Sequence, residues 1–87
     1  MSKSIKCLLF AKLKEIFDNN SEITITLPID KCTTLNLLNE IKSLYPKSIY
    51  IINISLVAIN CEYIEKDKDV IINENDEVAI IPPVSGG

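Results

Sequence analysis

The sequence predicts a single α+β domain in which a mixed sheet curls around one main helix. Three observations support this prediction. Segments with strand-type alternation lie near both ends of the chain, one longer segment with helical spacing lies between them, and no internal repeat or linker divides the 87 residues. The elements follow in the order strand, short helix, strand, helix and then three or more strands. A chain of this length forms one compact core.

The first strand is expected from Ile5 to Phe10. Its residues alternate between two faces, with Ile5, Cys7 and Leu9 on one face and Lys6, Leu8 and Phe10 on the other. Because both faces carry apolar residues, the strand is expected to lie inside the sheet. A short helix is expected next, because Leu13, Ile16 and Phe17 recur at helical spacing. A polar Asp-Asn-Asn-Ser stretch then ends this helix.

The second strand and the main helix follow. A half-buried strand is expected from Glu22 to Leu27, because β-branched residues alternate there with threonines. Thr33 or Thr34 is a candidate N-cap for the main helix, which is expected to run to about Leu44 before a proline stops it. The apolar residues at helical spacing predict its buried stripe, which comprises Leu35, Leu38, Ile41 and Leu44 or Tyr45.

The C-terminal half is expected to supply the remaining strands. Residues 47–55 are apolar without a clear period and allow no assignment. The expected elements after them are a strand at 56–60, a turn at 61–62, a short return strand at 63–64, a charged loop at 65–69, a turn at 73–76 and a last strand at 77–81. The second turn is rich in asparagine, which tolerates left-handed backbone angles.

Composition excludes several classes of function. The formal net charge is −3, from 9 basic and 12 acidic residues, and no basic cluster of the kind that nucleic-acid binding requires is present. The chain contains no histidine, which removes the commonest metal ligand and the commonest general base. Cys7, Cys32 and Cys61 have no disulfide or zinc spacing, and we interpret them as buried or half-buried apolar residues in a reducing, cytoplasmic setting. We therefore expect no metal, nucleic-acid or membrane partner.

The C-terminal sequence is the informative motif. Both glycines of the protein, Gly86 and Gly87, stand at its end. The residues directly before them are Pro82, Pro83, Val84 and Ser85. The prolines end the last strand, and a segment without Cβ atoms is able to thread a narrow channel. Its bare, ionised carboxylate is suited to attack an activated phosphate, which gives an acyl-adenylate. We predict a domain over 1–82 and a flexible tail over 83–87 with Gly87 as the reactive residue; the alternative is a frayed end without function.

A family resemblance extends this interpretation. Residues 76–87, Asp-Glu-Val-Ala-Ile-Ile-Pro-Pro-Val-Ser-Gly-Gly, resemble the C-terminal signature of the small subunit of molybdopterin synthase, the MoaD family. Residues 8–15 resemble the first strand and following helix of that family, and residues 62–65 are similar to its eukaryotic members. The resemblance spans nearly the whole chain. Two positions depart from the pattern, because Lys14 stands where many members have arginine and Asn75 stands where glycine is common.

The resemblance implies a ubiquitin-like β-grasp fold and a sulfur carrier that is not an enzyme on its own. It implies that an E1-like activating enzyme uses ATP to adenylate Gly87 and then converts it to a thiocarboxylate. It further implies that the tail from Pro82 to Gly87 inserts into the large synthase subunit, of the MoaE type, and passes sulfur to cyclic pyranopterin monophosphate. Two small and two large subunits would form a heterotetramer, and no cofactor would stay bound to the small subunit.

A docking surface is expected on the second face of the first strand. Leu8 and Phe10 lie on that face. Together with Ala79, Ile81 and Val84 they are expected to form an exposed apolar patch. The alternative is that Leu8 and Phe10 pack in the core. The tail from Pro82 onward is expected to be buried only in the complex.

Three other functions remain open. The first is a sulfur carrier of the same fold for thiamine synthesis or tRNA thiolation, although Pro-Pro-Val-Ser before the glycines argues against it. The second is a protein modifier joined through Gly87 to lysines of target proteins. The third is an interaction module with an idle tail. Removal of the two terminal glycines separates the third function from the others, because such a module keeps its full activity without them.

Overall fold

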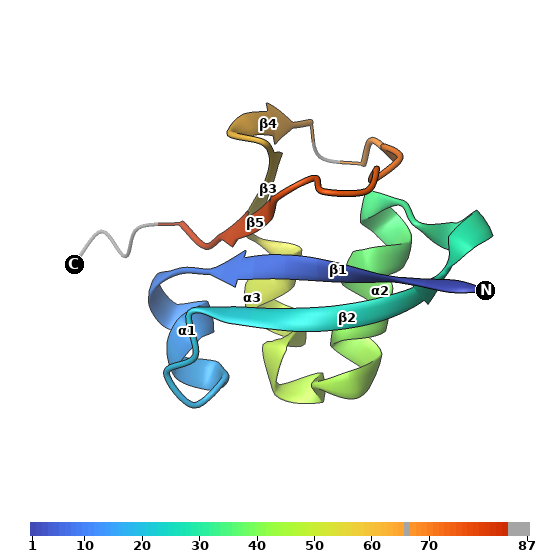
Figure 1. Cartoon of the computed structure of the whole chain (residues 1–87). Helices are drawn as coiled ribbons and strands as arrows, with labels where there is room; N and C mark the ends of the chain where they lie inside the picture. Colours follow the sequence, from blue (N-terminus) through green and yellow to red (C-terminus); the bar gives the residue numbers. More distant parts are fainter. Residues whose placement is uncertain (66, 84–87) are drawn as a thin grey trace.

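The computed structural model describes residues 1–65 and 67–83 (Figure 1). Its helices and strands, in chain order, are β1 (Ser2–Leu9), α1 (Ala11–Ile16), β2 (Glu22–Pro28), α2 (Thr34–Leu44), α3 (Ile49–Asn53), β3 (Leu56–Ile59), β4 (Glu62–Ile64) and β5 (Val78–Ile81). Single 3-10 turns, η1 (Ile29–Lys31) and η2 (Pro46–Ser48), lie on either side of α2. The expected order of elements is therefore confirmed.

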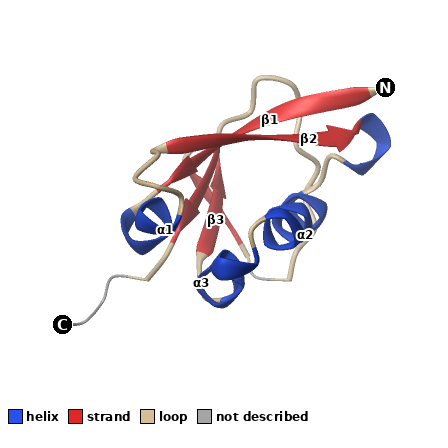
Figure 2. Cartoon of the chain, turned by 90° about the horizontal axis from the view of Figure 1, so that it is seen from below, coloured by secondary structure: helices blue, strands red, loops and turns tan. Residues whose placement is uncertain are grey.

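In the described part of the chain, five strands form one mixed sheet in the order β2-β1-β5-β3-β4. β1 and β5 run parallel, and the other neighbouring strands are antiparallel. The helices lie together on one side of this sheet, and α2 is the longest of them (Figure 2). This arrangement is the predicted α+β fold with a mixed sheet curled around one main helix. It also places the first and last strands side by side in the interior of the sheet.

Alternation along β1 builds the core face of the sheet. Every second residue is buried there, and the buried set is Ile5, Cys7 and Leu9. Ile5 lies opposite Ile25 of β2, so that the buried residues of the two strands form one apolar surface. Lys6 points to the other face, where its ammonium group lies 3.7 Å from the carboxylate of Glu22. Each fully buried aliphatic side chain contributes about 1.5–3 kcal/mol. The predicted division of this strand into two faces is confirmed.

The N-terminus of α2 is held from two directions. The hydroxyl oxygen of Thr33 accepts a hydrogen bond of 3.4 Å from the N–H of Asn36, so Thr33 is the N-cap of the two candidates. The N–H of Leu35 donates to the Asp69 carboxylate at 3.1 Å. Thr34 is buried, and its hydroxyl bonds the backbone of the loop that carries Asp69. The charged loop after β4 therefore fixes the start of the main helix.

The buried stripe of α2 differs from the predicted one. Leu37 and Ile41 are fully buried, and Leu38 is half-buried. Leu35 and Leu44 were expected in the stripe, but they are 38% and 53% exposed. The predicted and observed stripes share Leu38 and Ile41 and differ by a rotation of the helix about its axis. Because both stripes have helical spacing, only packing against the sheet distinguishes them.

The segment that the sequence did not assign folds as η2 and α3. Ile51 and Ile52 of α3 enter the core, which explains why this stretch is apolar.

Tyr45, the alternative end of the predicted α2 stripe, is 41% exposed. Its ring packs edge-on against Phe17 at a centroid distance of 4.6 Å. The contact covers the part of the core to which Phe17 belongs.

The three cysteines differ in exposure. Cys7 and Cys32 are buried, and burial raises the pKa of the Cys7 thiol to about 12. Cys61 is exposed, which corrects the expectation that all three are buried or half-buried. It occupies the turn between β3 and β4, where Asn60 and Cys61 have left-handed φ angles of 51° and 71°. Such a pair forms a tight two-residue hairpin turn and leaves the second side chain outside the core.

Candidate functional site

The last strand, β5, leads to the chain end that is predicted to carry the chemistry. This strand lies between β1 and β3, so both of its edges are paired within the sheet. Val78 and Ile80 are fully buried on the core face. Ala79 and Ile81 are half-buried on the opposite face. β5 therefore gives the residues that follow it a fixed starting point.

Two prolines end β5, as the sequence predicts. Neither has a backbone N–H to continue the ladder, and Ile81 is the last residue of the strand. Pro83 is exposed, whereas Pro82 is buried. The expectation that the tail is buried only in a complex is therefore wrong for Pro82. Its apolar ring extends the buried packing of β5 by one residue, and the fixed φ of both prolines restricts the direction of the exit.

Val84, Ser85, Gly86 and Gly87 lie outside the described residues. The reactive role of Gly87, the threading of the tail and the place of Val84 in the docking patch stay predictions. The structure gives the attachment point of these residues, at the end of the middle strand of the sheet (Figure 1).

Apolar side chains form a row across the outer face of the sheet, away from the helices. The strand registers place Leu8 opposite Ala79, and Ala79 opposite Ala58. Ala58 lies in turn opposite Tyr63. Side chains at directly opposed positions contact one another on the same face. We call these four residues, together with Phe10, Leu56 and Ile81, the outer apolar face.

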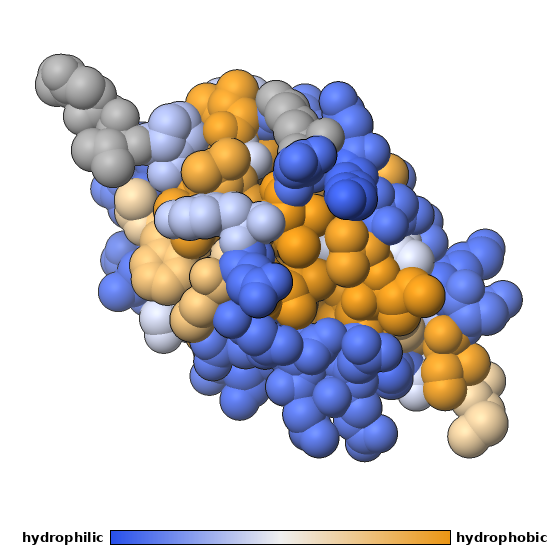
Figure 3. Space-filling view, turned by 90° about the horizontal axis from the view of Figure 1, so that it is seen from above, coloured by the Kyte–Doolittle hydropathy of each residue, from blue (hydrophilic) through white to orange (hydrophobic). Residues whose placement is uncertain are grey.

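The outer apolar face is exposed at Phe10, Leu56 and Tyr63, whereas Ala58 in its middle is buried. Leu56, which lies opposite Ile81, is 52% exposed, and Tyr63 is 67% exposed. Figure 3 views the molecule from the side on which β4 lies and shows a broad apolar area bordered by polar side chains. The residues predicted for docking, Leu8, Phe10, Ala79 and Ile81, all lie on this face at the end of the sheet where β5 exits. Neither Leu8 nor Phe10 belongs to the buried core.

A left-handed residue sets the position of Phe10. Phe10 continues β1 in an extended conformation, with φ −130° and ψ 153°, so its side chain points to the same face as Leu8 and is 45% exposed. Ala11 then has φ 52°, a conformation that costs a non-glycine residue about 1–2 kcal/mol. The turn allows Leu13 to be fully buried from α1. Burial of Leu13 therefore offsets the strain, and Phe10 stays directed outward.

A hydrogen-bonded clamp fixes the start of β5. The side-chain amide of Asn60 donates to Asp76 at 2.8 Å and accepts from the N–H of Glu77 at 2.9 Å. The other carboxylate oxygen of Asp76 accepts from the N–H of Asn73 at 2.7 Å. The bond from Asn60, followed by that from Asn73, holds the pKa of Asp76 below its ordinary value. Asn75 has φ 70°, a left-handed conformation that asparagine tolerates, as the sequence predicts for this turn.

Sequence reasoning did not single out Asn60, Leu56, Ala58 or Tyr63 as part of the site. The alternation of residues 56–64 was visible, but it does not show which strand becomes their neighbour. The described residues of the site provide a surface on which another protein is able to bind. In residues 1–65 and 67–83, no group of three or more histidine, cysteine or acidic residues is placed to hold a metal ion. No helix within those ranges has the length and apolar character needed to cross a bilayer.

Comparison with known proteins identifies the relatives of the chain. The model of the ThiS family matches residues 7–87. The molybdopterin synthase sulfur carrier subunit of Dictyostelium discoideum is 52% identical over 87 residues, which cover 100% of both chains. The matched segment includes β1, β5 and the two terminal glycines.

Several solved structures share the fold. SAMP1 from Haloferax volcanii has a TM-score of 0.79 at 22% identity, and the match covers 98% of this chain and 100% of that one. A chain in the complex of subunits 1 and 2 of the molybdopterin-converting factor from Helicobacter pylori has a TM-score of 0.60 at 16% identity, over 98% of this chain and 100% of that one. At these identities the likeness shows the fold alone, and the ubiquitin-like β-grasp is confirmed.

Proposed function

The chain belongs to the ThiS family, and we propose on this basis that it is the sulfur carrier subunit of a molybdopterin synthase. The observation that carries the proposal is its 52% identity, over the whole length, to a protein of that name. The terminal Gly86-Gly87 supplies the chemical group that such a carrier requires. The paired β5 and the outer apolar face support it with a rigid base and a docking surface.

The loading step takes place on Gly87 in an E1-like activating enzyme. A carboxylate oxygen of Gly87 attacks the α-phosphorus of ATP, pyrophosphate leaves, and an acyl-adenylate forms. A sulfur donor then displaces AMP and leaves a thiocarboxylate. ATP is consumed by the activating enzyme, and no cofactor stays bound to the carrier.

The delivery step takes place in the large subunit of the synthase. The sulfur of the thiocarboxylate forms a bond to a side-chain carbon of cyclic pyranopterin monophosphate as a C–O bond at that carbon breaks. Water then cleaves the resulting thioester, which leaves the sulfur on the pterin and frees the carrier as a carboxylate. The dithiolene of molybdopterin contains two sulfur atoms, so each product consumes two loaded carriers. The acid and base groups come from the partners, because this chain has no histidine. We propose a heterotetramer of two small and two large subunits.

Docking uses the outer apolar face in this proposal. Exposed apolar patches of this kind mark protein interfaces. Phe10 and Ile81 lie at the end of the sheet where β5 exits, so a partner that covers them also receives the tail. The solved complex of the two subunits of the molybdopterin-converting factor contains a chain of this fold, which supports a large-subunit partner. The three free thiols suit a reducing compartment, and we propose the cytoplasm.

Intact-mass spectrometry tests the loading step directly. The carrier is incubated with its activating enzyme, ATP and a sulfur donor, and the expected result is replacement of one terminal oxygen by sulfur. Omission of ATP is the control and leaves the mass unchanged. The loaded carrier is then offered to the large subunit with cyclic pyranopterin monophosphate. Formation of molybdopterin supports the proposal, whereas sulfur delivery only to a thiazole precursor or to tRNA, or covalent attachment to lysines, contradicts it.

A further inference from the structure

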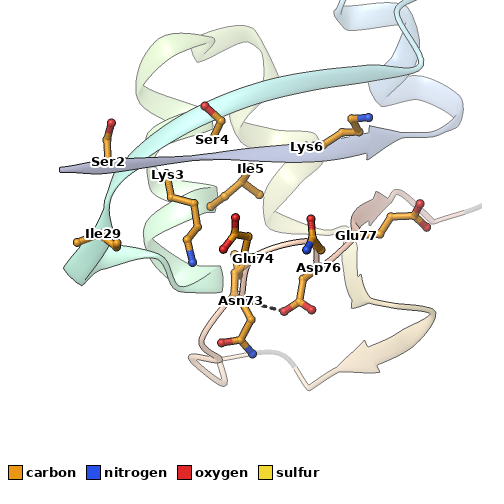
Figure 4. Close-up of a pocket in the computed structure, with 12 residues that line it drawn as sticks. Ser2, Lys3, Ser4, Ile5, Lys6, Ile29, Asn73, Glu74, Asp76 and Glu77 are labelled. Atoms are coloured by element: carbon orange, nitrogen blue, oxygen red, sulfur yellow. Dashed lines mark hydrogen bonds between the residues drawn. The ribbon is translucent and has the colours of Figure 1, made fainter.

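We propose that a groove at the start of β1 binds an extended, positively charged peptide segment of a partner protein by strand addition. The groove lies between Ser2–Lys6 of β1 and Asn73–Glu77, and it has a volume of about 660 Å³ (Figure 4). It is separate from the outer apolar face and from the exit of β5, which lie at the other end of β1. The inference therefore goes beyond the sulfur-carrier function.

One wall of the groove is an unpaired strand edge. β2 pairs with β1 from Ser2 to Leu8, but β5 pairs with it only from Cys7 to Leu9. Among the strands that the structure describes, none covers the second edge of residues 2–6. An exposed strand edge is a template for pairing with another chain.

The hydrogen-bonding groups of this edge face the groove. The carbonyl of Met1 accepts from the N–H of Ile29 at 3.1 Å, and the N–H of Leu9 donates at 2.8 Å on the same side of the strand. Strand alternation therefore turns the odd-numbered backbone groups toward β2. It turns those of even-numbered residues such as Ser4 into the groove, where a peptide strand is able to pair with them.

The opposite wall is held away from β1. The bond from the Asn60 amide to the Asp76 carboxylate and the two bonds between Asn60 and the backbone of Glu77 tie the turn to the β3–β4 hairpin. The turn is therefore not free to close over the strand edge. Ile5 and Ile72, which are both buried, form an apolar floor between the two walls. The groove thus combines an apolar floor, an open edge and a fixed far wall.

The charges along the groove favour a cationic occupant. Glu74, Asp76 and Glu77 make the far wall acidic, although Asn60 and Asn73 engage the Asp76 carboxylate and the Glu77 side chain points away from the groove (Figure 4). The β1 wall carries two lysines. Lys6 pairs with the carboxylate of Glu22 on the outer face, so Lys3 is the lysine of this wall that balances part of the acidic charge. An extended peptide with alternating lysine or arginine places its charges against this acidic wall and its other side chains over the floor.

Amide chemical shifts in ¹⁵N-labelled protein test the proposal. The probe is the blocked peptide acetyl-Lys-Val-Lys-Val-Lys-amide. We expect shift changes confined to residues 2–6 and 73–77, together with slower hydrogen exchange at the N–H of Ser4. The same peptide with N-methylated valine amides keeps its charge but loses backbone donors, and it is expected to bind about tenfold more weakly.

A pair of charge-reversal variants tests the location. Glu74→Lys is expected to weaken binding of the peptide about threefold. Glu15→Lys makes the same charge change at an exposed position of α1, away from the groove, and is expected to leave the affinity unchanged. The proposal is overturned if millimolar peptide causes no shift changes, if the changes scatter over the acidic surface, if N-methylation has no effect, or if both variants weaken binding equally.

Discussion

The two ends of β1 share one core face but differ on the outward side. The odd-numbered residues face the core at both ends, where Lys3 is half-buried and Ile5, Cys7 and Leu9 are buried. The outward residues change from Ser4 and Lys6, near the open groove, to Leu8 and the following Phe10, near the exit of β5. Folding constrains only the buried half of the strand. The outward half is free to vary, and it indicates what each surface contacts.

This difference separates stability from function within one strand. An apolar outward residue gives little to the isolated fold, since it stays partly in water. A cluster of such residues therefore indicates an interface with a partner protein. Polar outward residues beside an unpaired strand edge can face either solvent or an added strand. Four experiments test whether the two ends of β1 and the strand beside it differ in this way.

The largest expected effect is on sulfur loading. Deletion of Gly86-Gly87 is expected to abolish the gain of sulfur in the intact-mass assay, because the carboxylate would no longer reach the activating site. The unfolding midpoint and the affinity of the groove for the cationic peptide should stay unchanged, since both depend on residues in the body of the domain. Sulfur delivery by the truncated chain would contradict the carrier function.

The next effect is on stability, and it compares two adjacent leucines. Leu9→Ala removes a side chain that is 2% exposed and is expected to lower the free energy of unfolding by about 3 kcal/mol. Leu8→Ala, on the half-buried outward side, is expected to cost about 1 kcal/mol. Urea unfolding measures both. Equal losses would show that the outer face is part of the core.

The third effect is on docking at the two ends of β1. Phe10→Ala is expected to weaken binding to the large synthase subunit about thirtyfold, the effect of removing an aromatic anchor from an interface. Ser4→Ala at the other end is the matched control and should leave the affinity unchanged. Titration calorimetry measures both values. Similar affinities for both variants would place the large subunit on another surface.

The smallest effect concerns the clamp at the start of β5. The pKa of Asp76 is lowered in the folded protein, so its contribution to stability is present above the ordinary carboxyl pKa of about 3.9 and is lost as the pH falls through the lower folded pKa. Because Asp76 is half-buried and its hydrogen bonds lie at the surface, we expect less than about 1 kcal/mol at neutral pH. The difference in unfolding free energy between the wild type and Asp76→Asn should therefore shrink in strong acid. A constant difference would show that the charge is not involved.

Much of the fold can be predicted from the sequence because the residues that alternate locally are also the ones that the core buries. The alternation of β1 and β2 predicts their two faces, and the residue types limit the cap of α2 to Thr33 or Thr34, of which the structure selects Thr33. The helix α2 shows where this reasoning ends. Its leucines satisfy two neighbouring stripes, and Leu37 is buried in place of Leu35 because packing against the sheet selects the rotation.

Other features depend on long-range pairing and are not visible in the sequence. The apolar stretch before β3 folds as two short helical turns, which are too short to establish a period. The groove exists because β5 starts its pairing at Cys7 and not at Ser2. Of the candidate site, the tail could be predicted from its residue types alone. The row from Leu8 to Tyr63 could not, since it requires the order of four strands.

The parallel pairing of β1 with β5 has a mechanical consequence. The two strands point in the same direction, so tension applied to the N-terminus and to the end of β5 pulls them in opposite directions along their common axis (Figure 1). All hydrogen bonds between Cys7–Leu9 and Val78–Ile80 are then loaded together in shear instead of opening one after another. An unfoldase that pulls on β5 would meet its greatest resistance when it separates β5 from β1.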